Sequence, residues 1–406
     1  MTAKILVSGA GHGGLCAAIH LAKAGFDVAV FEKKSREDMG YDWADFVDMS
    51  TFKSAGLDDP DCGVKYFYDT AFYGPSKDIK LVHEFSRDHP CVGIERKEVL
   101  KHLVSTAENC GVKFFFGVKV YGAIIKNGKV IGIEISDPSG KKEIFGDLVI
   151  DSAGADSPVR KSLPEHFGIQ REFKDGEIFT AYRALFERKS DYCTSPRYSI
   201  FFYHCKRKGM DWVITDEDFV DVLVGNFGEL TQKEIDKAIA DFKKDYDCLS
   251  DNLLRGGKIC KIPVRKALDK FVCNGYAAVG DSAAMVEPLS GSGMTLSMRA
   301  GKLLADALKD ANGVSDFDKA LERFEKDYFN QIGKYRLFND ASKNFLLSVG
   351  ADKFDKMINR KILTEKDFGG GKYTFSETLR RVWGFVRTPS VLTDAIRFLI
   401  DVKKTK

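Results

Sequence analysis

The sequence has no long hydrophobic run and no excess of charge of one sign. Its 62 basic and 59 acidic residues leave a formal net charge of +3, spread without a long basic block. Nucleic-acid partners select for a basic stripe or patch, so this balance argues against a nucleic acid and favours a small-molecule partner. A membrane-spanning helix needs about 20 consecutive apolar residues, and the sequence offers no such stretch.

Motifs that bind metals or build disulfide frameworks are also missing. No C-x-x-C pair occurs, and no histidines are closely paired. We therefore expect reduced thiols, no metal site and a cytoplasmic protein, since a strand-like segment at residues 4–7 leaves no room for a signal peptide. Contact with a membrane surface and the oligomeric state stay open. The cysteines are Cys16, Cys62, Cys91, Cys110, Cys193, Cys205, Cys248, Cys260 and Cys273.

What is present is a chain of 406 residues, 44% of them apolar, which is enough to bury the cores of two domains. The start alternates between patterns typical of a strand (5–8), a helix (13–24) and a strand (27–31), which indicates a βαβ unit. Further on, the patterns predict a helix at 97–109 and strands at 112–116, 119–125, 130–135 and 147–151. Asn127-Gly128 predicts a hairpin, because both residues tolerate positive φ. Residues 41–90 show no sustained period.

A different pattern follows, with antiparallel strands predicted at 178–186, 198–203, 212–214 and 220–224. Thr231 and Glu234 form a capping box that predicts the start of a helix. A short strand at 276–280 precedes a helix at 295–309, and the chain beyond 315 is mostly helical. We therefore predict an α/β fold: a Rossmann-like domain with a mostly parallel sheet (1–55, 91–165, 262–315), an inserted antiparallel substrate domain (56–90, 166–261) and C-terminal helices (316–406).

The first motif with chemical meaning is VSGAGHGGLCAAIHL, which begins at residue 7 and matches Gly-x-Gly-x-x-Gly between a strand and a helix. In such a turn Gly9 permits the tight bend, Gly11 lets a pyrophosphate approach the backbone, and Gly14 lets helix and strand pack closely. The helix N-terminus would offer N–H groups and a positive dipole to the phosphates. Glu32 would accept hydrogen bonds from a ribose and disfavour NADP. The other candidate cofactor-binding residues here are His12, Gly13 and Lys33.

The second motif is YAAVGDSAAMVEPLSGSGMTLSMRAGKLLADAL, at residues 276–308. Gly280-Asp281 ends a strand, and Pro288 precedes a Gly-x-Gly turn and a helix. This pattern resembles the second flavin motif of the para-hydroxybenzoate hydroxylase-like superfamily, which includes monooxygenases, geranylgeranyl reductases and flavin-dependent halogenases. The resemblance implies non-covalent FAD, a carboxylate of Asp281 on the ribityl chain, and backbone N–H groups at the pyrimidine edge. Those N–H groups would belong to Gly291, Ser292, Gly293 and Met294.

Two further stretches extend the resemblance. IERKEVLKHL (94–103) is similar to the family's arginine-led helix, which implies that Arg96 reaches the FAD phosphates or ribityl oxygens; a solvated charge is the alternative. Val120 falls where the family's adenine meets a strand. DLVIDSAGADSPVR (147–160) matches the third motif, but Ala153-Gly154 replaces the family's Asp-Gly, which puts the use of NADH or NADPH as electron donor in doubt.

Ala284, Thr295 and the pair Ala300-Gly301 depart from the hydroxylase pattern, and the small pair is closer to the Ser-Gly of the reductase and halogenase branches. KGMDWVITDEDFVDVLVGNFG (208–228) resembles a reductase segment, and also a halogenase segment, through Gly209, Trp212 and Ile214. We therefore favour reduction of a carbon–carbon double bond in an apolar or aromatic small molecule. The alternatives are an NAD(P)H-dependent monooxygenase and a non-catalytic flavin-binding module. Tyr41, Trp43 and Trp212 are candidate cavity residues, with loop or core positions as the alternative, and no catalytic residue can be assigned.

Overall fold

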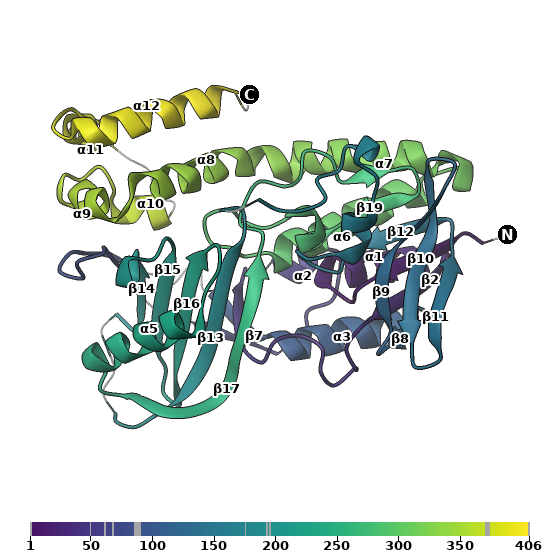
Figure 1. The fold of residues 1–406 in the computed structure, drawn as a ribbon, viewed down its shortest axis with the longest axis horizontal. Coiled ribbons are helices and arrows are strands. Elements are labelled where there is room, and N and C mark those ends of the chain that lie inside the picture. Colours follow the sequence, from purple (N-terminus) through teal and green to yellow (C-terminus); the bar gives the residue numbers. More distant parts are fainter. Residues whose placement is uncertain are drawn as a thin grey trace. The chain divides into compact units, whose positions relative to one another are not determined.

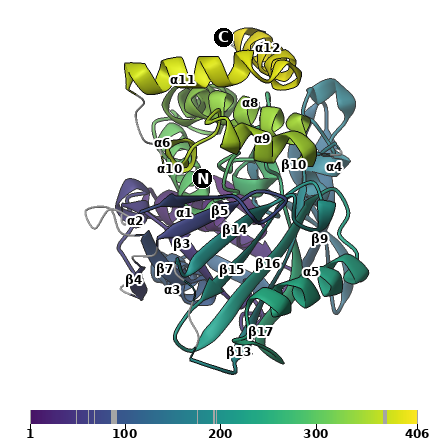
Figure 2. The same cartoon turned by 90° about the vertical axis from the view of Figure 1, so that its left-hand side faces the viewer.

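The computed structural model describes residues 2–48, 50–60, 62–66, 69–84, 91–174, 176–191, 194, 196–369 and 374–404. The chain divides into two compact units (Figures 1 and 2). The first comprises Met1–Val64, Val92–Lys174 and Pro263–Arg336, and the second Lys65–Cys91, Asp175–Ile262 and Leu337–Lys406. Cys193 and parts of the predicted substrate domain, such as residues 85–90, lie outside the described residues.

The first unit is built on a six-stranded sheet with the order β18-β19-β12-β1-β2-β8. All neighbouring strands are parallel except β18 and β19. Its central strands are near-continuous apolar runs, as expected for a sheet covered on both faces. The predicted, mostly parallel sheet is therefore confirmed. The strands are β1 (Lys4–Ser8), β2 (Asp27–Glu32), β8 (Lys113–Phe116), β12 (Leu148–Asp151), β18 (Val272–Cys273) and β19 (Tyr276–Ala278).

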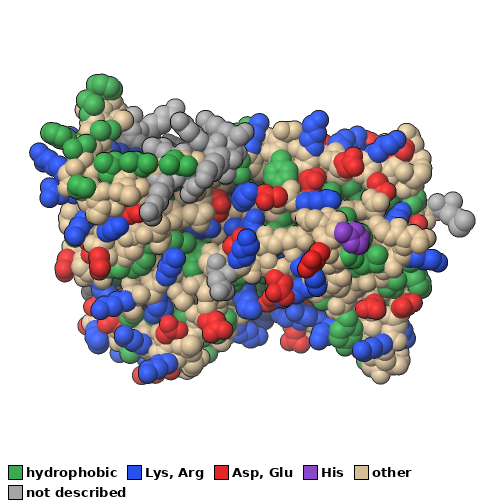
Figure 3. Space-filling model, turned by 45° about the horizontal axis from the view of Figure 1, so that its top comes forward, with side chains coloured by type: hydrophobic (Ala, Val, Ile, Leu, Met, Phe, Trp, Pro, Cys, Tyr) green, Lys and Arg blue, Asp and Glu red, His purple; other side chains and the backbone are tan. Residues whose placement is uncertain are grey.

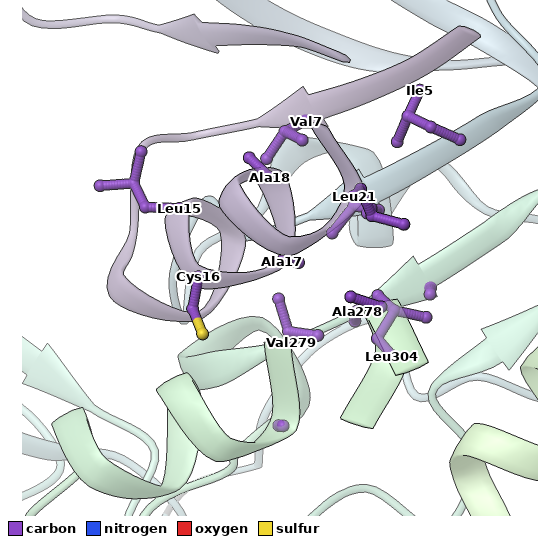
Figure 4. Packing of buried hydrophobic residues seen from close by; sticks show 14 of the residues in the cluster. Ile5, Val7, Leu15, Cys16, Ala17, Ala18, Leu21, Ala278, Val279 and Leu304 are labelled. Atoms are coloured by element: carbon purple, nitrogen blue, oxygen red, sulfur yellow. The ribbon is translucent and has the colours of Figure 1, made fainter. Parts of the chain in front are cut away.

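The main helices of this unit are α1 (His12–Lys23), α3 (Arg96–Asn109) and α6 (Met294–Lys309). Small side chains of α1, including Ala17 and Ala18, are fully buried beside Val7 and Val279 (Figure 4). Because these side chains are short, α1 can lie close to its neighbours. Shorter elements are α2 (Thr51–Ser54), α4 (Pro158–Ser162), and 3₁₀ turns at Glu165–Phe167, Gly280–Ala283 and Val314–Asp316.

A three-stranded antiparallel sheet, β11-β10-β9, extends the first unit. Its strands are β9 (Lys119–Lys126), β10 (Lys129–Asp137) and β11 (Gly140–Phe145). Asn127 and Gly128 have φ values of +51° and +71°, which confirms the predicted hairpin.

The second unit contains a seven-stranded sheet with the order β17-β13-β16-β15-β14-β5-β6. Helix α5 (Gln232–Asp245) packs on one face through Ile235, Ala238 and Phe242, and its capping box between Thr231 and Glu234 is present as predicted. The strands are β5 (Thr70–Tyr73), β6 (Lys80–His83), β13 (Phe179–Arg188), β14 (Tyr198–Phe202), β15 (Met210–Thr215), β16 (Phe219–Phe227) and β17 (Leu249–Ile262).

Strands also occur where the sequence shows no period. Besides β5 and β6, residues 41–90 include β3 (Ala44–Val47) and β4 (Gly63–Tyr66), which form a small sheet with β7 (Cys91–Glu95). Each of these four has only four residues. β3 pairs with β7 and β5 with β14, both far along the chain, and β6 pairs with β5. The expectation of an irregular segment was wrong, because pairing and not local pattern decides such strands.

The C-terminal helices do not form a region of their own. Phe317, Leu321, Phe324 and Tyr328 of α7 (Phe317–Tyr328) are buried in the core of the first unit. The structure therefore divides the chain near residue 336 and not at 316. A π-helical turn (Phe329–Gly333) leads into α8 (Lys334–Val349), α9 (Ala351–Asn359), α10 (Glu365–Gly369), α11 (Phe375–Val386) and α12 (Pro389–Lys404).

Two sequence expectations concern the whole chain. Among the described residues, no helix combines the length and the apolar character that crossing a membrane requires. The seven cysteines whose side chains are described form no disulfide with one another, and the expected reduced state stays a prediction.

Candidate flavin site

The glycine turn after β1 is shaped by close contact with the end of β12. Gly9 has a φ of +86°, and a Cβ there would lie 2.7 Å from the carbonyl oxygen of Ser152. A Cβ on Gly14 would lie 2.6 Å from Cβ of Ser152, and the N–H of Gly14 donates to Ser152 Oγ at 3.1 Å. Both positions therefore require glycine, and Gly14 has the packing role that the sequence predicts.

Gly11 and Gly13 also have packing roles. A Cβ on Gly11 would lie 2.5 Å from Ser152 Oγ, so the missing side chain makes room for β12. The expected role of Gly11 in letting a pyrophosphate approach the backbone stays a prediction. A Cβ on Gly13 would lie 2.8 Å from the carbonyl oxygen of Ser297 in α6. A substitution of Gly11 would therefore disturb the fold as well as any ligand.

His12 is the first residue of α1 and has a buried ring nitrogen. Within the described part of the chain, Nε2 has no hydrogen-bond partner. Burial, together with the nearby charge of Arg96, lowers the pKa of His12 to about 3, against a smaller opposing effect of Asp45. A neutral imidazole with an unpartnered nitrogen, placed at a helix N-terminus beside an arginine, fits a site for a phosphate or another acceptor-rich ligand.

Glu32 joins the end of β2 to the glycine turn. Its carboxylate accepts hydrogen bonds from the N–H of Ala10 and the N–H of Lys34, both at 2.9 Å. Each carboxylate oxygen can accept a second bond, so capacity for ribose hydroxyls remains. The carbonyl oxygen of Glu32 accepts from Val118 N–H at 2.9 Å, which brings the start of β9, with Val120, beside this carboxylate. Lys33 is exposed.

Arg96 begins α3 and is held by residues from β3 and from the loop between β2 and β3. Its Nε donates to a carboxylate oxygen of Asp45, and its backbone N–H donates to the carbonyl oxygen of Trp43 at 3.2 Å. The guanidinium lies 5.5 Å from the centre of the Tyr41 ring, which stacks on Trp43 at 4.5 Å. The predicted cavity residues Tyr41 and Trp43 therefore support Arg96, and only 3% of Trp43 is exposed.

Asp281 lies in the 3₁₀ turn after β19. Desolvation raises the pKa of this carboxyl group, and the positive charge of Arg96 opposes the shift. Arg96 thus lies within electrostatic reach of both Asp281 and His12. Among the described residues no hydrogen-bond donor reaches the Asp281 carboxylate. A Cβ on Gly293 would lie 3.4 Å from Asp281 Oδ1, so the Gly-x-Gly turn approaches this oxygen directly.

In the turn before α6, some of the predicted backbone N–H donors already have acceptors within the protein. The N–H of Gly291 donates to the carbonyl oxygen of Glu287 at 2.8 Å, and the N–H of Ser292 lies 3.3 Å from Ser290 Oγ. Pro288 is buried within the turn. For the N–H groups of Gly293 and Met294, the described residues supply no acceptor. These two groups, at the positive end of α6, are the free donors of the motif.

We expect Asp281→Ala to weaken FAD binding strongly. Loss of a charge-assisted hydrogen bond costs about 1.5–3 kcal/mol, so the Kd should rise by roughly 10- to 100-fold. Asp310→Ala removes an exposed carboxylate just after α6 and is the matched control. Titration of the apoprotein with FAD, followed by flavin fluorescence, measures the effect. Equal Kd values for the two variants would contradict the role of Asp281.

A buried polar network behind this loop was not predicted. Arg160 is fully buried and donates from Nη1 to the carbonyl oxygen of Ser282 at 2.6 Å. The carboxylate of Asp151 accepts from the hydroxyl groups of Tyr276 at 2.8 Å and of Ser282 at 3.0 Å. Because Ser282 follows Asp281, this network fixes the flavin-motif turn. Both Asp151 and Arg160 belong to the third sequence motif. Their spacing in the sequence does not reveal that they take part in one buried polar network.

The residues that departed from the hydroxylase pattern also have structural reasons. A Cβ on Gly301 would overlap the carbonyl oxygen of Gly13 and lie 3.0 Å from the nitrogen of Ala17. Gly301 therefore lets α6 lie against α1. Thr295 Oγ1 lies 2.8 Å from Thr51 Oγ1, a contact with α2. These contacts explain the residue types at both positions without reference to a reaction.

Trp212 lies on β15 in the second unit, on the sheet face opposite α5. The guanidinium of Arg183 lies 5.2 Å from the centre of its ring, and Tyr198 meets the ring edge-on. Arg183 is in turn held by Asp221, with an Nε to Oδ1 distance of 3.0 Å. In the described part of the chain, the buried indole nitrogen has no hydrogen-bond partner. The prediction that Trp212 lines the substrate cavity stays a prediction.

A cluster of potential metal ligands also appears in the second unit. The ligand atoms of His204, Cys205 and Asp241 lie within 4.8 Å of one another. Nδ1 of His204 lies 2.6 Å from Asp211 Oδ2, and Nε2 lies 2.9 Å from Asp241 Oδ2. Lys77 Nζ lies 2.6 Å from the same Asp241 oxygen. Since nearby cations balance this carboxylate, we interpret the cluster as an ion-pair network, and the expectation of no metal site stays a prediction.

Two family models match the chain. One, described as FAD binding domain, matches residues 2–313, which is well over half of the sequence. The chain belongs to the FAD-binding domain family. The predicted cofactor, FAD, is confirmed by this match. A second model, described as squalene epoxidase, matches residues 251–393.

Relatives match over nearly their whole length. The digeranylgeranylglycerophospholipid reductase of Haloferax volcanii is 26% identical over 388 residues, with 87% of this chain and 88% of the relative covered. That of Sulfolobus acidocaldarius is 23% identical over 432 residues, with 99% and 91% covered.

Solved structures share the fold. A geranylgeranyl bacteriochlorophyll reductase-like protein from Thermoplasma acidophilum has a TM-score of 0.77 at 19% identity, with 98% of this chain and 99% of that chain covered. A flavin-dependent brominase has a TM-score of 0.63 at 17% identity, with 95% and 99% covered. These similarities show the fold, and the family match at residues 2–313 confirms the predicted superfamily.

Proposed function

We propose that this member of the FAD-binding family is an oxidoreductase that reduces carbon–carbon double bonds in an apolar isoprenoid chain. The observation that carries the proposal is the similarity to digeranylgeranylglycerophospholipid reductases along 87% to 99% of this chain. The candidate flavin site in the first unit supports it, because its polar groups match the parts of FAD one after another. The cytoplasmic location expected from the sequence stays a prediction.

We assign a role in FAD binding to each residue of the candidate flavin site. Glu32 would accept hydrogen bonds from the ribose, and Arg96 with the N-terminus of α1 would balance the phosphate charge. Asp281 would accept from the ribityl chain, and the N–H groups of Gly293 and Met294 would bind the pyrimidine edge. When bound, FAD supplies hydride-transfer chemistry. Donors at the pyrimidine edge and the dipole of α6 would stabilise negative charge there.

The second unit offers an apolar surface for a substrate. The sheet face opposite α5 carries Ile200, Trp212 and Leu223, in neighbouring positions of β14, β15 and β16. An isoprenoid chain has no polar group to bind, so such a surface would hold it by burial of apolar area. The paired Arg183 and Asp221 below Trp212 offer polar atoms for the substrate's other end.

The experiment that tests the function separates reduction from hydroxylation. The bound flavin is reduced with dithionite without oxygen, and its absorbance is followed when a geranylgeranyl lipid is added. A reductase reoxidises its flavin and returns a product that has gained two hydrogen atoms. NADH and NADPH are then compared as electron donors in place of dithionite.

Two other outcomes would contradict the proposal. If the flavin reoxidises only when oxygen is admitted and the product gains an oxygen atom, the chain is a monooxygenase. If neither isoprenoid nor oxygen changes the rate of reoxidation, the chain binds flavin without this chemistry. Trp212→Ala should raise the KM for the lipid without changing the FAD content.

A further inference from the structure

Helices α11 and α12 expose large apolar side chains on one side. On α11 these residues recur at helical spacing, and their exposed fractions range from 51% to 80%. Hydrophobic side chains gather at the upper left of Figure 3, in the region where Figure 1 draws the two helices. We call this surface the α11–α12 face. It consists of Phe375, Leu379, Val382, Trp383, Val386, Leu392, Ile396 and Ile400.

The opposite sides of the two helices are fixed to the rest of the second unit. A Cβ on Gly384 would lie 2.6 Å from the carbonyl oxygen of Arg360, so α11 packs closely on the turn after α9. Val391 is fully buried in a cluster with Tyr203 and Phe354. The α11–α12 face is therefore held outward by a packed support, and it cannot be buried by turning the helices inward.

The segment that carries this face has an excess of positive charge. Residues 374–404 contain six arginine and lysine residues and three acidic residues, a net charge of +3. Glu377 is paired with Lys366 and Asp394 with Lys353, both at 2.8 Å, and Arg381 is paired with Asp367 at 3.0 Å. Arg387 stays at the surface, with its guanidinium 5.2 Å from the centre of the Trp383 ring. An apolar face with an aromatic residue, in a segment with an excess of positive charge, is typical of helices that lie in a membrane interface.

We propose that the α11–α12 face docks on the surface of a bilayer that contains anionic lipids. A second copy of this chain is a poorer partner, because two such faces would bring like charges together. A bilayer satisfies both features, since its headgroups attract the cations and its acyl boundary buries the apolar side chains. The inference does not depend on the proposed reaction, although a lipid substrate would give the docking a purpose.

Vesicle flotation of the FAD-loaded full chain tests the proposal. Binding to vesicles of phosphatidylcholine with phosphatidylglycerol is expected, with at least about tenfold weaker binding to phosphatidylcholine alone. The double variant Leu379→Glu, Trp383→Glu should lower the partition coefficient at least about tenfold. Leu254→Glu is the matched control, because Leu254 is 51% exposed on β17, away from this face. Retained flavin absorbance and an unchanged Tm show that each variant is folded.

Fluorescence quenching tests where the protein contacts the bilayer without introducing a charged residue. Brominated lipid should quench the fluorescence of Trp383, which is 58% exposed, and Trp383→Phe should remove the quenched component while binding persists. The proposal is overturned if the wild-type chain does not bind anionic vesicles. It is also overturned if the Leu379→Glu, Trp383→Glu double variant binds these vesicles as well as the Leu254→Glu control. It is also overturned if sedimentation shows a dimer that only the double variant dissociates, because a second copy then covers the face. None of these results bears on flavin reoxidation, so the proposed reaction stands or falls separately.

Discussion

Replacing Gly301 with leucine should leave little folded protein. The missing side chain of Gly301 lets the backbone of α6 touch α1, where a Cβ would overlap the carbonyl oxygen of Gly13 and crowd the nitrogen of Ala17. Backbone atoms cannot relieve an overlap by changing rotamer as a side chain can, so the two helices must move apart. Overpacking of a core costs about 1–3 kcal/mol and occasionally more, and we expect at least about 3 kcal/mol here. This is a large share of the ~5–15 kcal/mol that stabilises a folded domain.

The matched variant is Lys309→Leu, at the exposed end of the same helix. It adds the same side chain without entering the contact with α1. Unfolding in urea compares the two proteins at equal ionic strength, and FAD content compares their sites. Separation of the helices also shifts Met294 and Gly13, so surviving Gly301→Leu protein should have lost flavin. Similar unfolding midpoints for both variants would show that the helices tolerate a wider spacing.

The contact also bears on how the sequence can be interpreted. Ala300-Gly301 pointed to the reductase branch, but the close approach to Gly13 explains the glycine on packing grounds alone. The support for reduction therefore comes from similarity along the chain and not from this pair. A glycine in a helix next to a cofactor motif can be required by a neighbouring helix as readily as by a ligand.

Local signals predicted the parts of the fold that local physics determines. Gly9 and Gly14 mark the βαβ turn because a side chain there would strike β12, and Asn127-Gly128 marks a hairpin because both residues have positive φ. The capping box of Thr231 and Glu234 depends only on the first turn of its own helix. Each of these features is decided within a few residues, so the sequence displays it directly.

Features that depend on distant partners were missed. Strand β17 was not predicted, because its pairing with β13 is interrupted by shifts in register and includes Gly256. Strands β3 to β6 are short and are fixed by pairing with strands far along the chain or with one another. The site shows the same division: its motif residues were predicted, whereas the support of Arg96 by Asp45 and Tyr41 depends on how a loop folds back.

Arg160→Met should destabilise the protein and weaken FAD binding together. Arg160 is fully buried and donates to the carbonyl oxygens of Ser282, Ala155 and Arg171. Its charge also acts on Asp151, which is buried in the same network. Methionine fills a similar volume but leaves three carbonyl groups and one carboxylate without their cation. Removing one partner from such a buried network costs about 3–5 kcal/mol.

The effect on FAD follows from the position of Ser282, since this residue fixes the turn that carries Asp281. Arg160 is thus a positioning residue, and its removal should raise the Kd for FAD at temperatures where the variant is still folded. Arg160→Lys keeps the charge and should recover part of the stability but little of the affinity, because an ammonium group cannot reach all three carbonyl groups. Arg171→Met, which removes a half-exposed arginine from the same region, should change neither quantity by more than a small fraction. If Arg160→Met lowers stability but binds FAD with unchanged Kd, the network supports the core without shaping the site.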